Sequence, residues 1–203
     1  MTLDAALSRL RLYDALYQPV EHSTLANRPV TQPCTDRIAI MEPYLGPPGV
    51  VLDIGCHTGW FSREFAKRGW RVFGIDKSHE WLEIARSLNG LLDPEVNRPI
   101  YDCVDVFAQG NLFGKADVAL CLSTVMYWFH PDFQSNVERG WKLMHRISHS
   151  SPRLFMDFGG MYAGLLPFTE ATVREQFLAN TLYTEGQLIG CTSLGRPLFL
   201  FTR

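Results

Sequence analysis

The sequence has none of the features that mark secreted, membrane-spanning or metal-binding proteins. Its five cysteines include no Cys-x-x-Cys pair, and an odd number without metal-ligand spacing indicates reduced thiols in a cytoplasmic protein and no metal site. No apolar stretch approaches the ~20 residues of a membrane-spanning helix. The first 19 residues include Asp4 and Asp14 and lack the apolar core of a signal peptide.

Clustered positive charge is also missing. The formal net charge is −2, and the 19 lysines and arginines are scattered along the chain. Proteins that bind nucleic acid usually gather such residues on one face. RNA and DNA are therefore disfavoured as substrates. The sequence gives no indication of the oligomeric state.

The composition is that of a globular protein with a substantial core. The chain has 203 residues, of which 46% are hydrophobic and 12% aromatic, enough to bury a core without disulfides and too apolar for disorder. No repeat or low-complexity tract divides it. We therefore expect a single domain, with residues 1–47 as a helical N-terminal cap or lid and residues 48–203 as its core.

In the middle of the chain, short apolar runs alternate with segments in which apolar residues recur at helical spacing. We expect helices and strands in turn, with strands at 50–54, 71–76, 100–106, 117–123 and 153–159 and helices at 60–68, 78–88 and 132–147. This rhythm is typical of crossover connections and a mostly parallel sheet.

The two ends of the chain follow a different pattern. Apolar residues recur at helical spacing over residues 3–17, which predicts an opening helix, and a short helix is expected over roughly 36–45. Near the C-terminus a helix at 169–179 precedes two strands that only residues 194–196 connect. So short a link forces an antiparallel hairpin.

The stretch VLDIGCHTGWFS (51–62) places Gly55 and Gly59 directly after the first expected strand. In an open parallel sheet, ligands bind beyond the C-terminal strand ends, where the strand order reverses. Asp76 ends the second expected strand, 23 residues after Asp53, and an acid ~20 residues beyond such a glycine turn reaches a ribose diol. Together these features indicate a cofactor that carries a ribonucleoside.

The chemistry of the turn favours one cofactor over the dinucleotides. A dinucleotide site prefers Gly-x-Gly-x-x-Gly, with its pyrophosphate on the helix N-terminus, whereas here Asp53 precedes the first glycine. A carboxylate there would repel a diphosphate but suits an ammonium and a sulfonium, which points to S-adenosylmethionine. No Gly-x-x-x-x-Gly-Lys-Ser/Thr motif supports a nucleoside triphosphatase. Another Rossmann-like nucleotide binder is the alternative.

Residues 50–78 (VVLDIGCHTGWFSREFAKRGWRVFGIDKS) resemble the first two motifs of the class I S-adenosylmethionine-dependent methyltransferases. VDVF (104–107) and ADVALCLSTVMYW (116–128) resemble that family's later cofactor segments. The resemblance covers roughly residues 48–160, and the tail resembles the family by architecture. It implies an α/β fold: a Rossmann-like, seven-stranded, mostly parallel sheet with an antiparallel C-terminal hairpin and helices on both faces.

The resemblance also assigns cofactor-binding residues. Its first motif implies that the turn shapes the methionine end of the site, with Asp53, Gly55, Cys56, His57 and Gly59. The later segments imply contacts to the ribose from Asp76, to the adenine from Lys77, Asp105 and Val106, and to the methionine from Leu122 and Ser123. The stem of Lys77 would pack on the adenine ring.

His57 stands where the family usually has a glycine. Two interpretations stay open: its ring packs away from the cofactor, or it lies near the methyl group or the substrate. A fainter resemblance, through GWFS (59–62) and GRPLFLF (195–201), is to members that methylate glycan ends or phosphate groups.

Candidate catalytic residues follow the fourth and fifth expected strands. Tyr127, His130 and Asp157 are the titratable groups there, and a general base matters only where the acceptor must lose a proton. The alternatives are a rim tyrosine, a histidine at a helix entry and a loop-capping carboxylate. In the expected lid at residues 21–30, Arg28 is a candidate for the cofactor carboxylate or an acidic acceptor, as is Arg37.

We therefore expect methyl transfer from S-adenosylmethionine to a small or medium-sized acceptor, favoured at oxygen: a sugar, a phosphate or another metabolite. A glycan acceptor falls in this class. Two alternatives remain, namely the same chemistry on RNA or protein and a non-catalytic module that binds S-adenosylmethionine.

Overall fold

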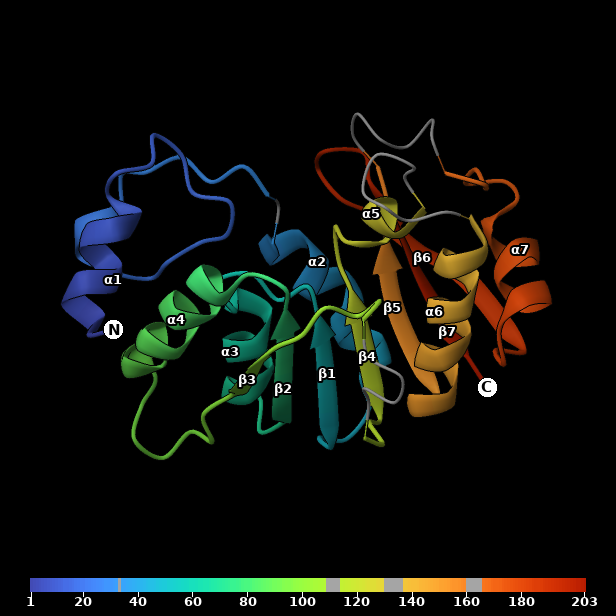
Figure 1. Ribbon diagram of the computed structural model, residues 1–203, viewed down its shortest axis with the longest axis horizontal. Coiled ribbons are helices and arrows are strands. Elements are labelled where there is room, and N and C mark those ends of the chain that lie inside the picture. Colours follow the sequence, from blue (N-terminus) through green and yellow to red (C-terminus); the bar gives the residue numbers. More distant parts are fainter. Residues whose placement is uncertain (33, 109–113, 130–136, 160–165) are drawn as a thin grey trace.

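A computed structural model describes residues 1–32, 34–108, 114–129, 137–159 and 166–203 (Figure 1). In these residues one seven-stranded sheet has the order β3-β2-β1-β4-β5-β7-β6. Its strands are β1 Val50–Ile54, β2 Arg71–Asp76, β3 Ile100–Cys103, β4 Val118–Cys121, β5 Arg153–Asp157, β6 Glu185–Cys191 and β7 Pro197–Thr202.

The sheet confirms the predicted fold class. Strands β1 to β5 pair in parallel, whereas β7 runs antiparallel to both β5 and β6. The strand order reverses between β1 and β4, since the chain adds β2 and β3 on one side of β1 and β4 on the other. A switch point of this kind leaves a crevice beyond the C-terminal strand ends.

Helices cover both faces of the sheet (Figure 1). The described helices are α1 Leu3–Leu10, α2 Cys34–Met41, α3 Trp60–Lys67, α4 His79–Leu88, α5 Val125–Phe129, α6 Val137–Ser150 and α7 Val173–Asn180, with short 3-10 turns η1 Ser23–Leu25, η2 Glu42–Tyr44 and η3 Asn89–Leu91. Residues of α2 and α3 form the apolar core on one face, and residues of α5, α6 and α7 form the core on the other.

Local sequence signals account for several of these boundaries. The Ser78 hydroxyl accepts a hydrogen bond from the Trp81 backbone N–H and caps α4, as serine commonly does at this position. Gly69, at φ 84°, follows α3 in the left-handed conformation expected after a helix end. Strands β1 and β2 have the predicted bounds, because buried apolar runs in a parallel sheet are easy to delimit.

Other predicted boundaries were wrong. The opening helix ends at Leu10, because the chain beyond it turns and Leu16 pairs with residues 29–31 through two backbone hydrogen bonds. Strand β3 ends at Cys103, since the Phe107 N–H turns back to the Asp105 carboxylate. Helix α5 was not predicted.

No helix in the described ranges is both long and apolar enough to cross a lipid bilayer.

The packing of β7 against α7 gives a test of the core. Phe201 is fully buried and stacks on Phe177 at 4.5 Å between ring centroids. Phe201→Ala should therefore lower the free energy of unfolding by about 3–5 kcal/mol, measured by urea denaturation. Leu188→Ala, on the neighbouring strand β6 and 45% exposed, should change it by no more than about 0.5 kcal/mol. Similar losses in the two variants would contradict this packing.

Candidate functional site

A cavity of about 690 Å³ lies at the C-terminal ends of β1, β2 and β4. Its volume falls in the range of roughly 300–1,000 Å³ that is typical of small-molecule sites. Four segments and one side chain of the N-terminal cap line it: the turn after β1 (Ile54, Gly55, His57), the end of β2 (Ile75, Asp76, Lys77), residues 104–107 after β3, the segment after β4 (Leu122, Ser123, Thr124, Tyr127, Trp128), and Tyr17.

The turn after β1 has an unusual backbone that brings it close to its neighbours. Gly55, His57 and Gly59 all have positive φ, at 75°, 54° and 73°. A Cβ atom on Gly55 would lie 2.0 Å from Cγ2 of Thr124. Only glycine fits at residue 55 without displacing the chain after β4, and the two loops form one continuous wall of the cavity.

The carboxylate of Asp76 ties this turn to the end of β2. Oδ2 of Asp76 accepts a hydrogen bond from the His57 N–H at 3.0 Å, and Oδ1 accepts one from the Ser78 N–H at 2.9 Å. A carboxylate oxygen has two lone pairs, so both oxygens can still accept a hydrogen bond. Asp76 thus presents two acceptors to the cavity, which matches the two hydroxyls of a ribose.

His57 forms part of the cavity wall and of an aromatic stack. Its ring lies 4.2 Å from the Trp81 ring and 4.9 Å from the Tyr17 ring, between ring centroids. Burial lowers the pKa of His57 to about 4, so the ring is neutral at neutral pH. Its Nδ1 is buried without a hydrogen-bond partner among the described residues.

Asp53 lies behind the turn and does not line the cavity. Its side chain is 3% exposed, and Oδ2 accepts a hydrogen bond from the Ser62 hydroxyl at 2.6 Å. Burial raises the pKa of Asp53 to about 6. Cys56 and Gly59 are likewise absent from the cavity lining. These three residues belong to the end of β1 and the turn after it, but none of them faces the cavity.

Gln18 anchors the N-terminal cap on the same turn, a contact that sequence reasoning missed. Its Oε1 accepts hydrogen bonds from the Trp60 N–H at 3.1 Å and from the Thr58 hydroxyl at 2.9 Å. It therefore caps α3, whose N-cap residue is Gly59 and has no side chain to do so. No local signal marks Gln18, because its partners are some 40 residues away.

The remaining predicted cofactor residues divide into two groups. Five of them line the cavity where they were expected, namely Lys77, Asp105, Val106, Leu122 and Ser123. Arg28 does not line it: its guanidinium donates to the Arg11 carbonyl at 2.7 Å. Arg28 therefore holds residues 21–30 against the chain that follows α1.

A buried polar cluster lies beside Ser123. The Ser123 N–H donates to Oδ1 of Asp157 at 2.5 Å, and Nη2 of Arg37 lies 2.7 Å from Oδ2 of Asp157. Arg37 and Asp157 are 1% and 0% exposed. Burial raises the pKa of Asp157, and the nearby Arg37 charge opposes that shift. Asp157 is thus paired within the protein and, unlike Ser123, does not line the cavity.

Of the other two candidate catalytic residues, the structure describes only Tyr127. Tyr127 lines the cavity and is 40% exposed. His130 lies outside the described residues.

Sequence and structure comparisons agree on one family. Residues 51–146 match the family described as a methyltransferase domain. Over 65 residues the chain is 35% identical to a Methanococcus maripaludis protein named "Probable cobalt-precorrin-6B C(15)-methyltransferase (decarboxylating)". This match covers 32% of the chain and 36% of that protein.

Two solved structures illustrate the shared fold. The bifunctional kinase-methyltransferase WbdD superposes with a TM-score of 0.73 at 20% identity, over 98% of this chain and 46% of its own. Magnesium protoporphyrin IX methyltransferase from Synechocystis PCC 6803, in a structure with bound S-adenosylmethionine, gives 0.64 at 18% identity and covers 88% of this chain and 87% of its own. The chain thus covers less than half of the curated relative and of WbdD.

The sheet order, the glycine turn after β1 and the acid that ends β2 define a Rossmann-like nucleoside-binding protein. The family match is more specific. Residues 51–146 match a methyltransferase domain, which confirms the resemblance of residues 50–78 to the class I S-adenosylmethionine-dependent methyltransferases.

The cavity fits the cofactor of this family. Asp76 has an accepting position on each oxygen for a ribose diol. Apolar side chains of Val104, Val106 and Phe107 line the cavity beyond β3, where a flat base can pack. The absence of a side chain at Gly55 leaves backbone at the wall. S-adenosylmethionine is therefore compatible with the residues present.

The raised pKa of Asp53 predicts a pH dependence of stability. A folded-state pKa of about 6 lies above the ordinary value of 3.8, so Asp53 stabilises the fold fully below pH 3.8 and this contribution is lost as the pH rises through 6. Between pH 5 and 7.5 the wild type should lose about 1.4 kcal/mol relative to Asp53→Asn, which carries no charge.

Urea denaturation of both proteins at the two pH values measures this difference. His57 titrates in a nearby window with the opposite sign, but it is present in both proteins and its effect cancels in the comparison. Parallel pH dependences for the two proteins would show that Asp53 is not held in a desolvated environment.

Proposed function

We propose that this protein transfers the methyl group of S-adenosylmethionine to a small or medium-sized acceptor at an oxygen atom of a sugar, a phosphate or another metabolite. The observation that carries the proposal is the position of Asp76, whose carboxylate joins the turn after β1 to α4 and keeps two acceptors available at the cavity wall. The five free cysteines are in keeping with a cytoplasmic location.

In this proposal the two ends of the cavity have separate roles. Asp76 takes the ribose hydroxyls, while Lys77, Asp105 and Val106 enclose the adenine. The methionine part lies along Gly55, Leu122 and Ser123. Arg28 keeps residues 21–30 in place against the chain that follows α1. The bound cofactor supplies a methyl group activated by positively charged sulfur.

Catalysis then depends mainly on how the chain places the acceptor. Holding two reactants in a near-attack arrangement can remove roughly 7–11 kcal/mol of barrier. Tyr127, at the cavity wall, and His130 are the proposed proton-handling residues, a role worth roughly 10²–10⁴-fold where the acceptor loses a proton. Asp157 acts through Ser123, whose backbone it holds.

The similar proteins are named for different acceptors, cobalt-precorrin-6B and magnesium protoporphyrin IX among them. They support methyl transfer as the reaction of this chain but do not indicate which molecule accepts the methyl group. In this proposal the residues around Ser123 and Tyr127 at the cavity wall determine the specificity for the acceptor.

Calorimetric titration with S-adenosylhomocysteine tests the proposed cofactor site. Asp76→Asn removes the charge that would bind the ribose hydroxyls, and hydrogen bonds to charged groups contribute about 1.5–3 kcal/mol. The variant should therefore bind S-adenosylhomocysteine roughly 10- to 150-fold more weakly than the wild type.

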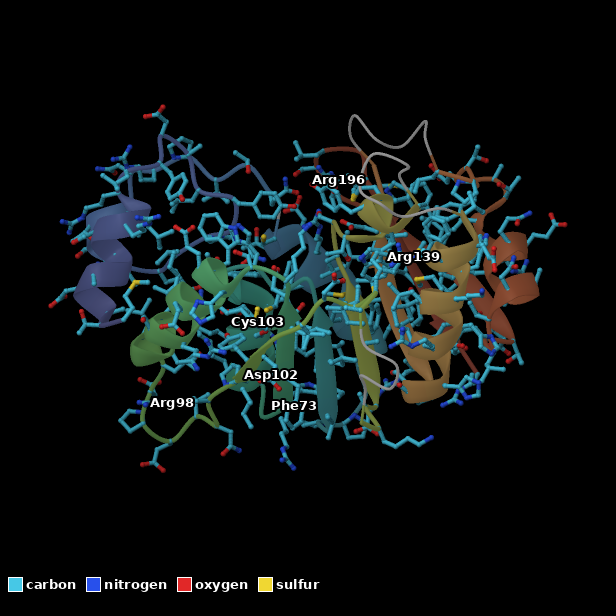
Figure 2. All side chains as sticks on the ribbon, in the orientation of Figure 1. Phe73, Arg98, Asp102, Cys103, Arg139 and Arg196 are labelled. Carbon is cyan, nitrogen blue, oxygen red and sulfur yellow. The ribbon has the colours of Figure 1, made fainter. Side chains whose placement is uncertain are left out.

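Asp102→Asn is a matched control for this titration. Asp102 lies on β3, opposite Ile75 of β2, and its side chain is exposed (Figure 2). This variant should bind like the wild type, and circular dichroism should show all three proteins folded. Absence of binding by the wild type, or equal affinity in Asp76→Asn, would defeat the proposal.

A further inference from the structure

Arg196 contacts a residue of the cavity wall from a distant part of the chain. It lies in the turn between β6 and β7, and Figure 2 shows it at the edge of the sheet where the parallel strands end. Its Nη1 donates a hydrogen bond to the Ser123 hydroxyl at 2.8 Å. Since Ser123 lines the cavity, a guanidinium from the C-terminal hairpin lies directly behind the cavity wall.

The Ser123 hydroxyl is left as a hydrogen-bond donor. Its Oγ accepts one bond from Arg196 and a second, also at 2.8 Å, from Nη2 of Arg37. A hydroxyl oxygen has two lone pairs and one proton, so both lone pairs are occupied and the proton must be donated. No described residue accepts it, so the proton is left for water or for a bound group.

Charge at this cluster is not balanced. Asp157 lies 2.7 Å from Arg37 and offsets that charge. No carboxylate in the described ranges lies within 4.0 Å of the Arg196 guanidinium, whose single side-chain partner there is Ser123. Nε of Arg37 and Oδ2 of Asp157 are also buried without a hydrogen-bond partner among these residues. With two guanidinium groups and one carboxylate, the cluster has one positive charge in excess.

The backbone holds this arrangement in a strained conformation. Ser123 has φ 57°, a left-handed value that non-glycine residues rarely adopt. Such strain persists where the surroundings over-determine it, and it is concentrated at ligand-binding sites. Here the Ser123 N–H is held by Asp157 and its hydroxyl by two arginines, so its donated proton has a defined position.

We propose that Ser123 and Arg196 bind an anionic group, a carboxylate or a phosphate, carried by the methyl acceptor. The assignment to the acceptor rests on the proposed function, in which Asp76 and Asp105 lie at the nucleoside end of the cavity and Ser123 lies along the methionine part, the end from which the methyl group is transferred. Guanidinium groups favour carboxylate and phosphate because they donate two parallel hydrogen bonds. The methyl acceptor is thus an acid, held by its charge.

Calorimetric titration of the full chain with inorganic phosphate, and separately with acetate, tests this site at low ionic strength. The wild type should bind at least one of the two anions, both with and without saturating S-adenosylhomocysteine. Tighter binding of phosphate would indicate a phosphorylated acceptor, and tighter binding of acetate a carboxylic acid. Arg196→Gln should weaken anion binding about tenfold or more.

Two further variants separate the site from general effects. Arg196→Lys keeps the charge and should retain part of the anion affinity. Arg98→Gln removes one positive charge at an exposed residue away from the cavity (Figure 2) and should leave anion binding unchanged. Absence of anion binding by the wild type, or equal weakening in Arg98→Gln and Arg196→Gln, would overturn the proposal.

The carboxylate of the cofactor is the other source of the same chemistry. If Arg196 held it, Arg196→Gln would weaken S-adenosylhomocysteine but not 5′-methylthioadenosine, which has no carboxylate, and this result would overturn the assignment to the acceptor. Anion binding that depends on Arg196 in a protein that fails to bind S-adenosylhomocysteine would support the anion site and defeat the proposed function instead.

Discussion

The site depends on one carboxylate that joins three parts of the chain. Asp76 ends β2, accepts a hydrogen bond from the turn after β1 and accepts another from the N-cap residue of α4. The backbone N–H groups of Gly55 and Cys56 add two bonds to the Ile75 carbonyl, at 2.8 and 3.0 Å. A turn with several left-handed residues is thus fixed on a rigid parallel pair of strands. The cavity wall is preformed, and binding a ligand there requires little ordering of the backbone.

Polarity differs between the two ends of the cavity. Asp76 and Asp105 place carboxylates at the nucleoside end, while Ser123 brings the donors of Arg37 and Arg196 towards the other. The protein backbone holds both carboxylates: Asp76 accepts from the N–H groups of His57 and Ser78, and Asp105 accepts from the Phe107 N–H at 2.9 Å. Such preorganisation suits a reaction in which placement of the reactants supplies most of the rate. The nucleoside end is formed by residues at or after the ends of β2 and β3, and the other end by residues that follow β4.

Much of this arrangement could be predicted because its signals are local. The first two strands, the cap of α4 and the acid at Asp76 all follow from short stretches of sequence. The position of Asp53 away from the cavity was not predicted, although a local rule explains it. Along β1 side chains alternate between faces, and Val51 belongs to the core that includes α3 whereas Leu52 and Ile54 belong to the opposite core. Alternation therefore directs Asp53 towards α3 and Ser62.

What the sequence could not indicate are contacts between distant segments. Gln18 caps a helix that begins 42 residues later, and Trp81 stacks on His57 from a different helix. Arg196 lies 73 residues from Ser123. Arg37 has the sequence context of an exposed helical residue but is fully buried against Asp157. Each of these contacts depends on how the cap and the C-terminal hairpin pack on the sheet, for which no single stretch carries a signal.

A crystal structure of the complex with S-adenosylhomocysteine tests the central claim most directly. The account predicts electron density for the nucleoside in the cavity after β1, β2 and β4, with both ribose hydroxyls at about 2.6–3.2 Å from the Asp76 carboxylate. Density for the ligand elsewhere on the molecule, or a ribose that makes no contact with Asp76, would contradict it.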